Sequence, residues 1–496
     1  MVFFLIAFSK KTQKTRVSLF EKSFKGIIWS FIDNFGLRIV TIGTFFFLAK
    51  ILGPEAFGLV AIATVFLSFS TVFVEFGVIT AIVQKPDLSE ENLSSTLWGN
   101  LAMGVLFFLL TFLFAPLIAW FFEEPELTPI LRVSGLVFIT DSLSKVQEGI
   151  LQKEFLFKAL AKRRLIASLV SAGVGIGMAL LDYGVWALVF QRLVFGFVQT
   201  VVIWIESPWK PKWYFSWKAF WEIFSFGYKM MFTNIVYFLN RHMDDLLVGY
   251  FMGPVVLGYY AIAYKVFSTL TDLITNTIYK VILPLYSKLQ DDKEKLISVF
   301  YRSTEFTSYA SFAVFAGVIV LAPFVVPLFF GETWIKSIEA MQILAIVGGL
   351  FTITHFVEGI YLSTGNPDLS LKFNSLLSFF YIVLFFLAID YGIEGIALSR
   401  VIGVLIVLPF MLAAMNKLVP FELKKFLSSI FKPAMAVIGA IGLFYLIQIS
   451  IDIEILWSVS IGIVLAGILY AGLIYFLNPA VLQVVNRLGG FFRPKA

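Results

Sequence analysis

Long stretches of the chain carry no charged residue, and this feature constrains the fold more than any other. Asp, Glu, Lys and Arg are all absent from residues 92–122, 306–331 and 455–486. A helix that crosses the hydrocarbon core of a bilayer needs about 20 mostly apolar residues, so each stretch is long enough to span it. Soluble domains average roughly 25% charged residues, whereas this chain has 14% and is 59% hydrophobic. The sequence therefore predicts a helical membrane protein.

Fourteen apolar segments are long enough to be membrane-spanning helices. They lie at residues 26–49, 57–83, 96–122, 128–151, 160–181, 185–205, 220–245, 257–285, 299–330, 335–362, 371–390, 396–415, 433–449 and 456–477. The short connections between them leave no room for a large soluble domain. We expect an all-α polytopic membrane protein with 14 transmembrane helices.

Several function classes are excluded by what the chain lacks. It has no Cys and two His, which argues against disulfides, thiolate nucleophiles and His-rich metal centres. It also lacks the G-x4-G-K-[ST] phosphate loop of nucleotide-driven pumps. We expect no metal, no cofactor, no catalytic residue and no nucleic-acid partner, so transport is favoured over catalysis.

The distribution of Lys and Arg predicts the orientation in the membrane. Loops on the cytoplasmic side accumulate these residues, and 27 of the 29 loop cations fall on alternate connections, including both ends of the chain. The opposite connections contain only Lys50 and Lys336. Residues 1–25 place the apolar run MVFFLIAF before the Lys residues, the reverse of a secretory signal. We expect a basic cytoplasmic leader and both termini on the cytoplasmic side of the cytoplasmic (inner) membrane.

An internal repeat relates two parts of the chain at an offset of 200 residues. Residues 52–71 read LGPEAFGLVAIATVFLSFST and residues 252–271 read MGPVVLGYYAIAYKVFSTLT, sharing a Gly-Pro-x3-Gly turn. Six spans separate the copies, so both enter the membrane in the same direction, and parallel repeats of this kind place substrate sites between the halves. We expect two six-helix lobes related by a parallel pseudo-twofold axis, plus a C-terminal helix pair.

These expectations divide the chain into six parts. They are a leader (1–25), an N-terminal lobe (26–206), an interfacial linker (207–219), a C-terminal lobe (220–416), an amphipathic linker (417–432), and helices 13 and 14 with the tail (433–496). The two linkers contain the Trp- and Lys-rich segment PWKPKWYFSWKAFW, which starts at Pro208, and the segment FELKKFLSSIFK, which starts at Phe421. Both patterns are typical of helices or loops that lie at the membrane interface.

Nine cations fall within predicted spans, where each costs at least about 2.5–3.5 kcal/mol at the bilayer centre. They must therefore face water, a counter-charge or a ligand. We assign six of them to a cationic substrate-binding cavity. They are Arg38, Arg241 and Lys265 near mid-depth, and Arg132, Arg192 and Arg400 at more peripheral positions. The alternative is that such cations pair with acids on neighbouring helices and only lock the bundle.

Polar residues recur at steps of three and four along the duplicated helices, which places each set on one helix face. The predicted polar lining consists of Asn34, Ser68, Thr71, Asn234, Tyr237, Thr269 and Asn276. Four acids at membrane depth are candidates for coupling to H+ or Na+. They are Asp33, Glu75, Asp272 and Glu358. His355 precedes Glu358 by three residues, but a satisfied internal pair explains that spacing equally well.

The pattern AKILGPEAFGLVAIATVFLSF with FVEFGVITAIVQ, and its counterpart DDLLVGYFMGPVVLGYYAIAYKV, resemble a known family. They are similar to the polysaccharide transporter branch of the multidrug/oligosaccharidyl-lipid/polysaccharide flippase superfamily, which includes the O-antigen, colanic acid and teichuronic acid exporters. The resemblance covers helices 1 to 12 and rests on diffuse patterns, without a short catalytic signature. Some members have helices 13 and 14 and others lack them.

This resemblance implies a flippase that moves an undecaprenyl-diphosphate-linked oligosaccharide from the cytoplasmic to the outer leaflet by alternating access. It also implies an ion gradient as the driving force and a functional association with a polysaccharide polymerase. Two alternatives stay open. One is a multidrug antiporter of the same superfamily, which would export organic cations. The other is a membrane-embedded polymerase or ligase for the same polymer.

Overall fold

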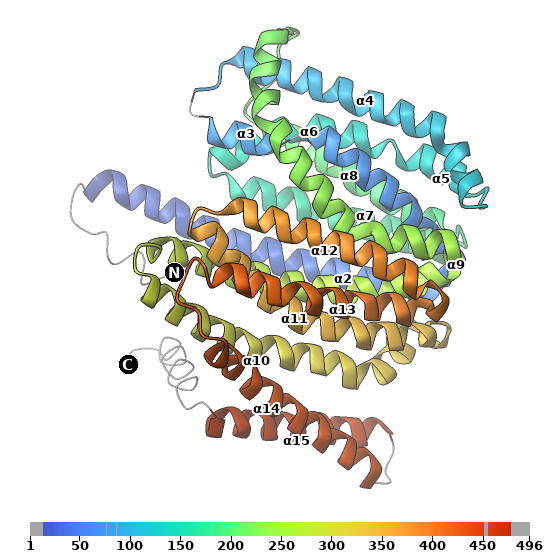
Figure 1. Cartoon of the computed structure of the whole chain (residues 1–496). Helices are drawn as coiled ribbons and strands as arrows, with labels where there is room; N and C mark the ends of the chain where they lie inside the picture. Colours follow the sequence, from blue (N-terminus) through green and yellow to red (C-terminus); the bar gives the residue numbers. More distant parts are fainter. Residues whose placement is uncertain (1–12, 76, 86, 451–454, 478–496) are drawn as a thin grey trace, which may run out of the picture. The chain divides into compact units, whose positions relative to one another are not determined.

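The computed structural model describes residues 13–75, 77–85, 87–450 and 455–477, and Figure 1 shows its helices. In these ranges every regular element is a helix and no strand is present. The α-helices are α2 (Gln13–Glu75), α3 (Val78–Gln84), α4 (Glu90–Phe121), α5 (Leu127–Ser134), α6 (Val137–Lys153), α7 (Phe157–Leu180), α8 (Trp186–Glu206), α9 (Trp217–Lys288), α10 (Lys293–Val325), α11 (Ile338–Ser363), α12 (Pro367–Ala388), α13 (Gly392–Met415), α14 (Leu423–Ser450) and α15 (Ile455–Leu477). Three short helices of other types are η1 (Val326–Phe330), η2 (Glu332–Ser337) and η3 (Ile389–Tyr391).

Eleven stretches of the described chain are long and apolar enough to cross a membrane. Three of them far exceed the roughly 20 residues that one crossing needs. These three are Gly36–Gln84, Asn234–Thr275 and Pro367–Met415, with 49, 42 and 49 residues. The prediction of an all-α polytopic membrane protein is confirmed. Residues 1–12 of the predicted leader and residues 478–496 of the predicted tail lie outside the described residues.

The chain packs as two compact units. Unit 1 comprises residues 1–262, 326–336 and 385–393, and unit 2 comprises residues 263–325, 337–384 and 394–496. Unit 1 thus includes two short segments, 326–336 and 385–393, that come from later in the chain than the rest of it.

The two repeated segments fold in the same way. Helix α2 is interrupted at Gly53 (φ 72°, ψ 176°) and helix α9 at Gly253 (φ 82°, ψ 173°). Only glycine adopts this backbone region without strain, and the proline that follows each glycine lacks an N–H for a continuous helix. The Gly-Pro pair therefore breaks the helix at equivalent positions. We call residues 52–58 the first repeat turn and residues 252–258 the second repeat turn.

The two repeat turns contact each other reciprocally within unit 1. A Cβ atom added at Gly58 would lie 1.7 Å from the carbonyl oxygen of Pro254, and one added at Gly258 would lie 1.9 Å from the carbonyl oxygen of Pro54. Each glycine of one turn thus packs directly on the proline backbone of the other turn. Any side chain at either position would force the two backbones apart.

Small residues also allow close approach elsewhere in unit 1. Helices α7 and α8 lie side by side (Figure 1), and Gly175 packs on the side chain of Gln191. Gly104 of α4 lies against Phe138 and Ser142 of α6, so closely that an added Cβ would be 2.1 Å from the Ser142 hydroxyl oxygen. Membrane helices, which gain little from burying apolar surface against each other, commonly pack through such residues.

Unit 2 is built around α10, which packs against α11 and α14. The ring of Phe315 packs directly on Gly348 of α11. A Cβ atom added at Gly348 would lie only 2.2 Å from that ring. Helices α14 and α15 form a pair that follows the rest of the unit in sequence (Figure 1). A large apolar cluster that includes Tyr286, Phe300 and Phe426 forms the core.

Candidate functional site

The three cations predicted near mid-depth lie on the two kinked helices. Arg38 of α2 is half-buried, and Arg241 of α9 is exposed; both belong to unit 1. Lys265, which follows the Gly253 break in α9, is exposed and belongs to unit 2. An exposed charge on a membrane-spanning helix requires water or an anion beside it. Arg241 and Lys265 are thus accessible at the surface of the unit that carries each of them.

Two of the peripheral cations are held by aromatic rings. Arg132 of α5 lies 4.5 Å from the centre of the Phe112 ring and donates from Nε to the Phe112 carbonyl at 3.2 Å. Arg400 of α13 is 3% exposed and lies 4.7 Å from the Tyr264 ring centre and 5.2 Å from that of Tyr381. Cation–π contacts of this kind stabilise a desolvated guanidinium. Both side chains therefore contribute to helix packing at these positions.

A network of opposite charges runs along one face of α6. Lys145 forms an ion pair with Glu75 of α2, and Asp141, one turn earlier on α6, interacts electrostatically with Lys145, Glu75 and Arg192 of α8. The side chain of Lys145 is only 15% exposed, whereas that of Glu75 is 43% exposed. In this ion pair the Lys145 side chain is therefore largely buried in unit 1, and the Glu75 side chain is partly exposed.

The same face of α6 continues to two arginines of α7. Glu148 lies 3.1 Å from Arg163 and 3.5 Å from Arg164, and both Glu148 and Arg163 are almost fully buried. Asp141, Lys145 and Glu148 are spaced four and three residues apart, which places them on one helix face. That spacing is visible in the sequence, but the sequence does not show that α2, α7 and α8 supply the opposite charges.

In unit 2, Glu358 of α11 is held by the first turns of α12. Its carboxylate accepts hydrogen bonds from the hydroxyl of Ser370 and, at 3.2 Å, from Nδ2 of Asn374. His355, one turn earlier, packs edge-on against the Tyr279 ring at 6.3 Å. These donors satisfy the hydrogen-bonding capacity of a carboxylate that is half-buried.

The predicted polar lining is only partly described. Asn234 and Tyr237 are exposed on α9, and Ser68 and Thr269 are half-buried. Thr71 donates to the Leu67 carbonyl of its own helix at 2.8 Å. The side chains of Asp33, Asn34 and Asn276 lie outside the described residues, and Asp272 is half-buried in unit 2. The exposed and half-buried members are compatible with a polar stripe that faces water.

Two buried acids that were not among the predicted site residues lie on α9 before the Gly253 break. Asp244 accepts a hydrogen bond from the Tyr260 hydroxyl, which lies beyond the break. Asp245 lies 3.0 Å from Nδ1 of His242. The Asp244–Tyr260 bond ties together the two parts of α9 on either side of Gly253. Two adjacent acids within a predicted span can be recognised in the sequence, but the sequence does not show that Tyr260, beyond the break, is the partner of Asp244.

The Trp- and Lys-rich linker is fixed to the start of α4. Backbone N–H groups of Lys212 and Ser216 donate to the hydroxyls of Ser94 and Ser95 at 3.1 and 2.9 Å. The Trp98 indole donates to the Lys212 carbonyl and stacks on Trp213 at 4.5 Å. Trp213 is nevertheless 92% exposed. A rigid loop that presents aromatic rings and Lys side chains fits the predicted membrane-interface role.

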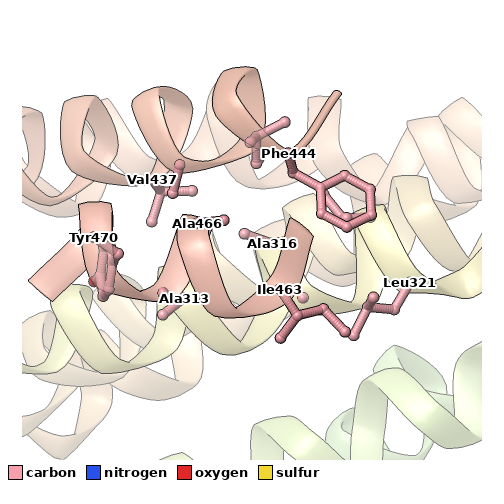
Figure 2. Close-up of a pocket in the computed structure, with 13 residues that line it drawn as sticks. Ala313, Ala316, Leu321, Val437, Phe444, Ile463, Ala466 and Tyr470 are labelled. Carbon is pink, nitrogen blue, oxygen red and sulfur yellow. The ribbon is translucent and has the colours of Figure 1, made fainter. Parts of the chain in front are cut away.

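An apolar groove of about 170 Å³ lies in unit 2 between α10, α14 and α15. Figure 2 shows Ala313, Ala316 and Leu321 of α10 facing Val437 and Phe444 of α14, with α15 completing the wall. Its lining offers almost no polar surface. A sugar or diphosphate needs hydrogen-bond donors or charges, so this groove does not suit the polar part of a substrate.

Several carboxylate side chains lie close together at the first repeat turn. Burial, together with the carboxylates of Glu55 in that turn and of Glu126, raises the pKa of the Glu124 carboxyl in the connection between α4 and α5. Lys and Arg dominate the alternate connections of the chain, as described above. The connection beside this turn is instead acidic.

Comparison with known proteins identifies the family. Residues 47–339, more than half of the chain, match the family described as "Polysaccharide biosynthesis protein". The chain belongs to this family. The resemblance to polysaccharide transporters that the repeated Gly-Pro segments indicated is thus confirmed.

Relatives of this polysaccharide biosynthesis protein span most of its length. Teichuronic acid biosynthesis protein TuaB of Bacillus subtilis (strain 168) is 24% identical over 431 residues, which are 86% of this chain and 89% of TuaB. Lipopolysaccharide biosynthesis protein WzxC of Escherichia coli (strain K12) is 26% identical over 74% of this chain and 75% of its own.

Solved structures share the fold of this polysaccharide biosynthesis protein. The lipid II flippase MurJ in an inward closed conformation has a TM-score of 0.76 at 18% identity, over 92% of this chain and all of that one. An inward-facing multidrug resistance MATE transporter of the MOP superfamily has a TM-score of 0.61 at 16% identity, over 77% of this chain and 95% of its own.

Proposed function

We propose that the protein is a flippase that moves a polyprenyl-diphosphate-linked oligosaccharide from the cytoplasmic to the outer leaflet. The observation that carries this proposal is that Arg38, Arg241 and Lys265 fall within stretches apolar enough to cross a membrane, in a chain of the polysaccharide biosynthesis family. A diphosphate is recognised by charge-assisted hydrogen bonds from such groups. The fold supports the proposal, because 92% of the chain matches that of a lipid II flippase.

Fourteen membrane crossings follow from the eleven apolar stretches if the three longest each cross twice. Each of these contains an interruption, at Gly53, at Gly253 or at η3. The crossings then form two six-helix lobes, related by the 200-residue repeat, and the pair α14 and α15. We place the Lys- and Arg-rich connections and both termini in the cytoplasm, with the protein in the inner membrane.

Alternating access supplies the transport step. The diphosphate and sugars bind in a hydrated cavity, for which Arg38, Arg241, Lys265 and the polar stripes are the proposed lining, while the lipid tail stays in the bilayer. Arg192 adds charge to this cavity. Arg132 and Arg400 hold neighbouring helices through their ring contacts. We expect no catalytic residue in this transport step, and an associated polysaccharide polymerase would consume the transferred product.

Ion coupling is assigned to two carboxylates on different units. Glu75 faces outward from a pair with Lys145, and Glu358 lies among the side chains of Ser370 and Asn374. Protonation of Glu75 would release Lys145 to its other neighbour, Asp141. Asp33 and Asp272 remain further candidates on the repeated helices. Either H+ or Na+ suits an acid at membrane depth.

Neutralising Glu75 is expected to uncouple transport from the ion gradient. In proteoliposomes, Glu75→Gln should transport at the same rate with and without a proton gradient, whereas the unmodified protein should be stimulated. The matched control is Glu206→Gln, because Glu206 is also paired with a lysine, Lys162, at 2.5 Å. Unchanged stimulation in Glu75→Gln, with only a lower melting temperature, would show that the pair has a structural role alone.

A multidrug antiporter is the second candidate. The MATE fold supports it, with a lower TM-score and over less of the chain than the flippase fold. An organic cation would prefer an acidic cavity, which the positions of Arg38, Arg241 and Lys265 disfavour. A polymerase or ligase is a third candidate, and activity of purified protein without transfer between leaflets would support it.

Depletion of the protein in its own cells tests the proposal. We expect lipid-linked oligosaccharide to accumulate on the inner leaflet, because synthesis continues while transfer stops. Leaflet-specific labelling of the sugar measures this distribution. The proposal fails if the lipid-linked oligosaccharide does not accumulate, or if organic cations accumulate instead.

A further inference from the structure

One tryptophan from outside the repeat contacts the first repeat turn and the residue that directly follows the second repeat turn. Trp334 of η2 is fully buried, and its indole N–H donates to the Ala49 carbonyl of α2 at 2.9 Å. The ring packs edge-on against Phe57, in the first repeat turn, at 5.5 Å. It packs in the same way at 6.0 Å against Tyr259, which directly follows the second repeat turn. All of these residues belong to unit 1.

The hydrogen bond is made at the helix break itself. Ala49 lies in the last helical turn before Gly53 and Pro54, and carbonyls in the last turn of a helix lack their full set of helical donors. Ala49 is fully buried, so its carbonyl has no ready access to water. The Trp334 indole thus gives this buried carbonyl a donor from a distant part of the chain, within one helical turn of the break.

The segment that carries Trp334 is itself anchored beside the first repeat turn. Phe330, also buried, contacts Phe46 at 4.6 Å and Phe45 at 6.1 Å. Gly331, with φ of 99°, then allows the chain to turn into η2. The segment 326–336 is thus part of unit 1, although the helices that flank it in sequence, α10 and α11, belong to unit 2.

We infer that Trp334 is a latch that holds the two repeat turns in contact and is released when they separate during transport. Gly58 and Gly258 contact the proline backbones without a side chain of their own, so further resistance to separation of the turns comes from side chains that bridge them. One indole that bridges both turns and is hydrogen-bonded to the helix break supplies that resistance. Trp334 is therefore a positioning residue for the step in which the two repeat turns separate. The inference rests on the proposed alternating access.

A single-cysteine reporter tests the latch, because the chain contains no cysteine. Ala56 lies in the first repeat turn and is 8% exposed, so Ala56→Cys reports when the turn becomes accessible. The rate of its reaction with a water-soluble maleimide is measured on the full chain in lipid nanodiscs. Adding Trp334→Phe, which keeps an aromatic ring but removes the N–H donor, should raise this rate about threefold to tenfold, as expected for the loss of one hydrogen bond.

The matched control is Trp120→Phe, because Trp120 is 75% exposed at the end of α4 and should leave the labelling rate unchanged. Trp334→Ala, which also removes the ring contacts, should raise the rate further if it folds. The latch is overturned if the reporter thiol reacts in the Ala56→Cys parent but Trp334→Phe does not change the rate, even when it lowers the melting temperature. If the reporter thiol never reacts in any variant while substrate still crosses, the separation of the repeat turns is itself wrong, and with it the proposed alternating access.

Discussion

Neutralising Arg38 and Arg241 together is expected to lower the rate of substrate transfer by about a hundredfold. A charge-assisted hydrogen bond to a phosphate contributes roughly 1.5–3 kcal/mol, so each glutamine substitution should lower the rate at least tenfold. Because Arg38 is half-buried and Arg241 is exposed, neither glutamine lies in the buried core, and the variants should fold. The rate is measured in proteoliposomes that contain lipid-linked oligosaccharide.

The control for this experiment is Arg302→Gln, which removes one positive charge from an exposed position near the start of α10. It should transfer substrate at the parental rate. If Arg302→Gln and the Arg38/Arg241 variant lose activity equally, the effect comes from overall charge and the assignment of a cationic cavity is wrong. If neither loses activity, the diphosphate is bound elsewhere.

Alanine at Gly58 or Gly258 is expected to disrupt the contact between the repeat turns. The new methyl group would lie 1.7 Å from the Pro254 carbonyl oxygen or 1.9 Å from that of Pro54, and backbone cannot yield as a flexible side chain does. Overpacking of this kind destabilises by typically 1–3 kcal/mol. We expect a lower melting temperature, a loss of transport of at least about tenfold and, in the Ala56→Cys background, faster labelling.

Gly43→Ala is the matched control, because Gly43 lies on the same helix α2 and an added Cβ there meets no atom within 4 Å. Alanine in an open helical position should leave the melting temperature unchanged or raise it. The double variant Gly58→Ala/Gly258→Ala should be less destabilised than the sum of the single variants, because both clashes are relieved by one separation of the turns. Full additivity would contradict the reciprocal contact.

The membrane helices and the repeat turns are predictable from local sequence patterns, which do not depend on how the rest of the chain packs. Apolar runs without charges predicted the spans, and the helices α4, α10 and α15 fall within or around the three longest charge-free stretches. The Gly-Pro repeat predicted equivalent turns at Gly53 and Gly253, since only glycine tolerates the required backbone angles and proline ends the preceding helix.

The partners of the charged residues are not predictable in the same way. Lys145 pairs with Glu75, which lies 70 residues earlier, and the Arg400 guanidinium lies between two tyrosines from different helices. Helix periodicity places a residue on a face, but which other helix meets that face depends on packing of the whole chain. The sequence therefore predicted where charges lie along each helix and not what they contact.

The role of Trp334 as a latch is likewise not predictable from the sequence. Nothing in the segment ETWIKS distinguishes this tryptophan from one that anchors a loop at the membrane interface. Its role follows from Ala49, Phe57 and Tyr259, which come from two repeats that lie about 200 residues apart in the chain. The interfacial linker behaves differently. The alternation of Trp and Lys predicts a place at the membrane interface, while the attachment of this linker to Ser94 and Ser95 is a tertiary feature that the sequence does not show.

Transfer between leaflets by the purified protein tests the central claim most directly. The protein is reconstituted into liposomes with a diphosphate-linked oligosaccharide lipid, and the outer-leaflet sugar is followed with an enzyme that cannot cross the membrane. We predict that the sugar pool of both leaflets becomes accessible with the parent protein and stays at the outer-leaflet fraction with the Arg38→Gln/Arg241→Gln variant. Equal access with the parent protein, the variant and protein-free liposomes would contradict the account.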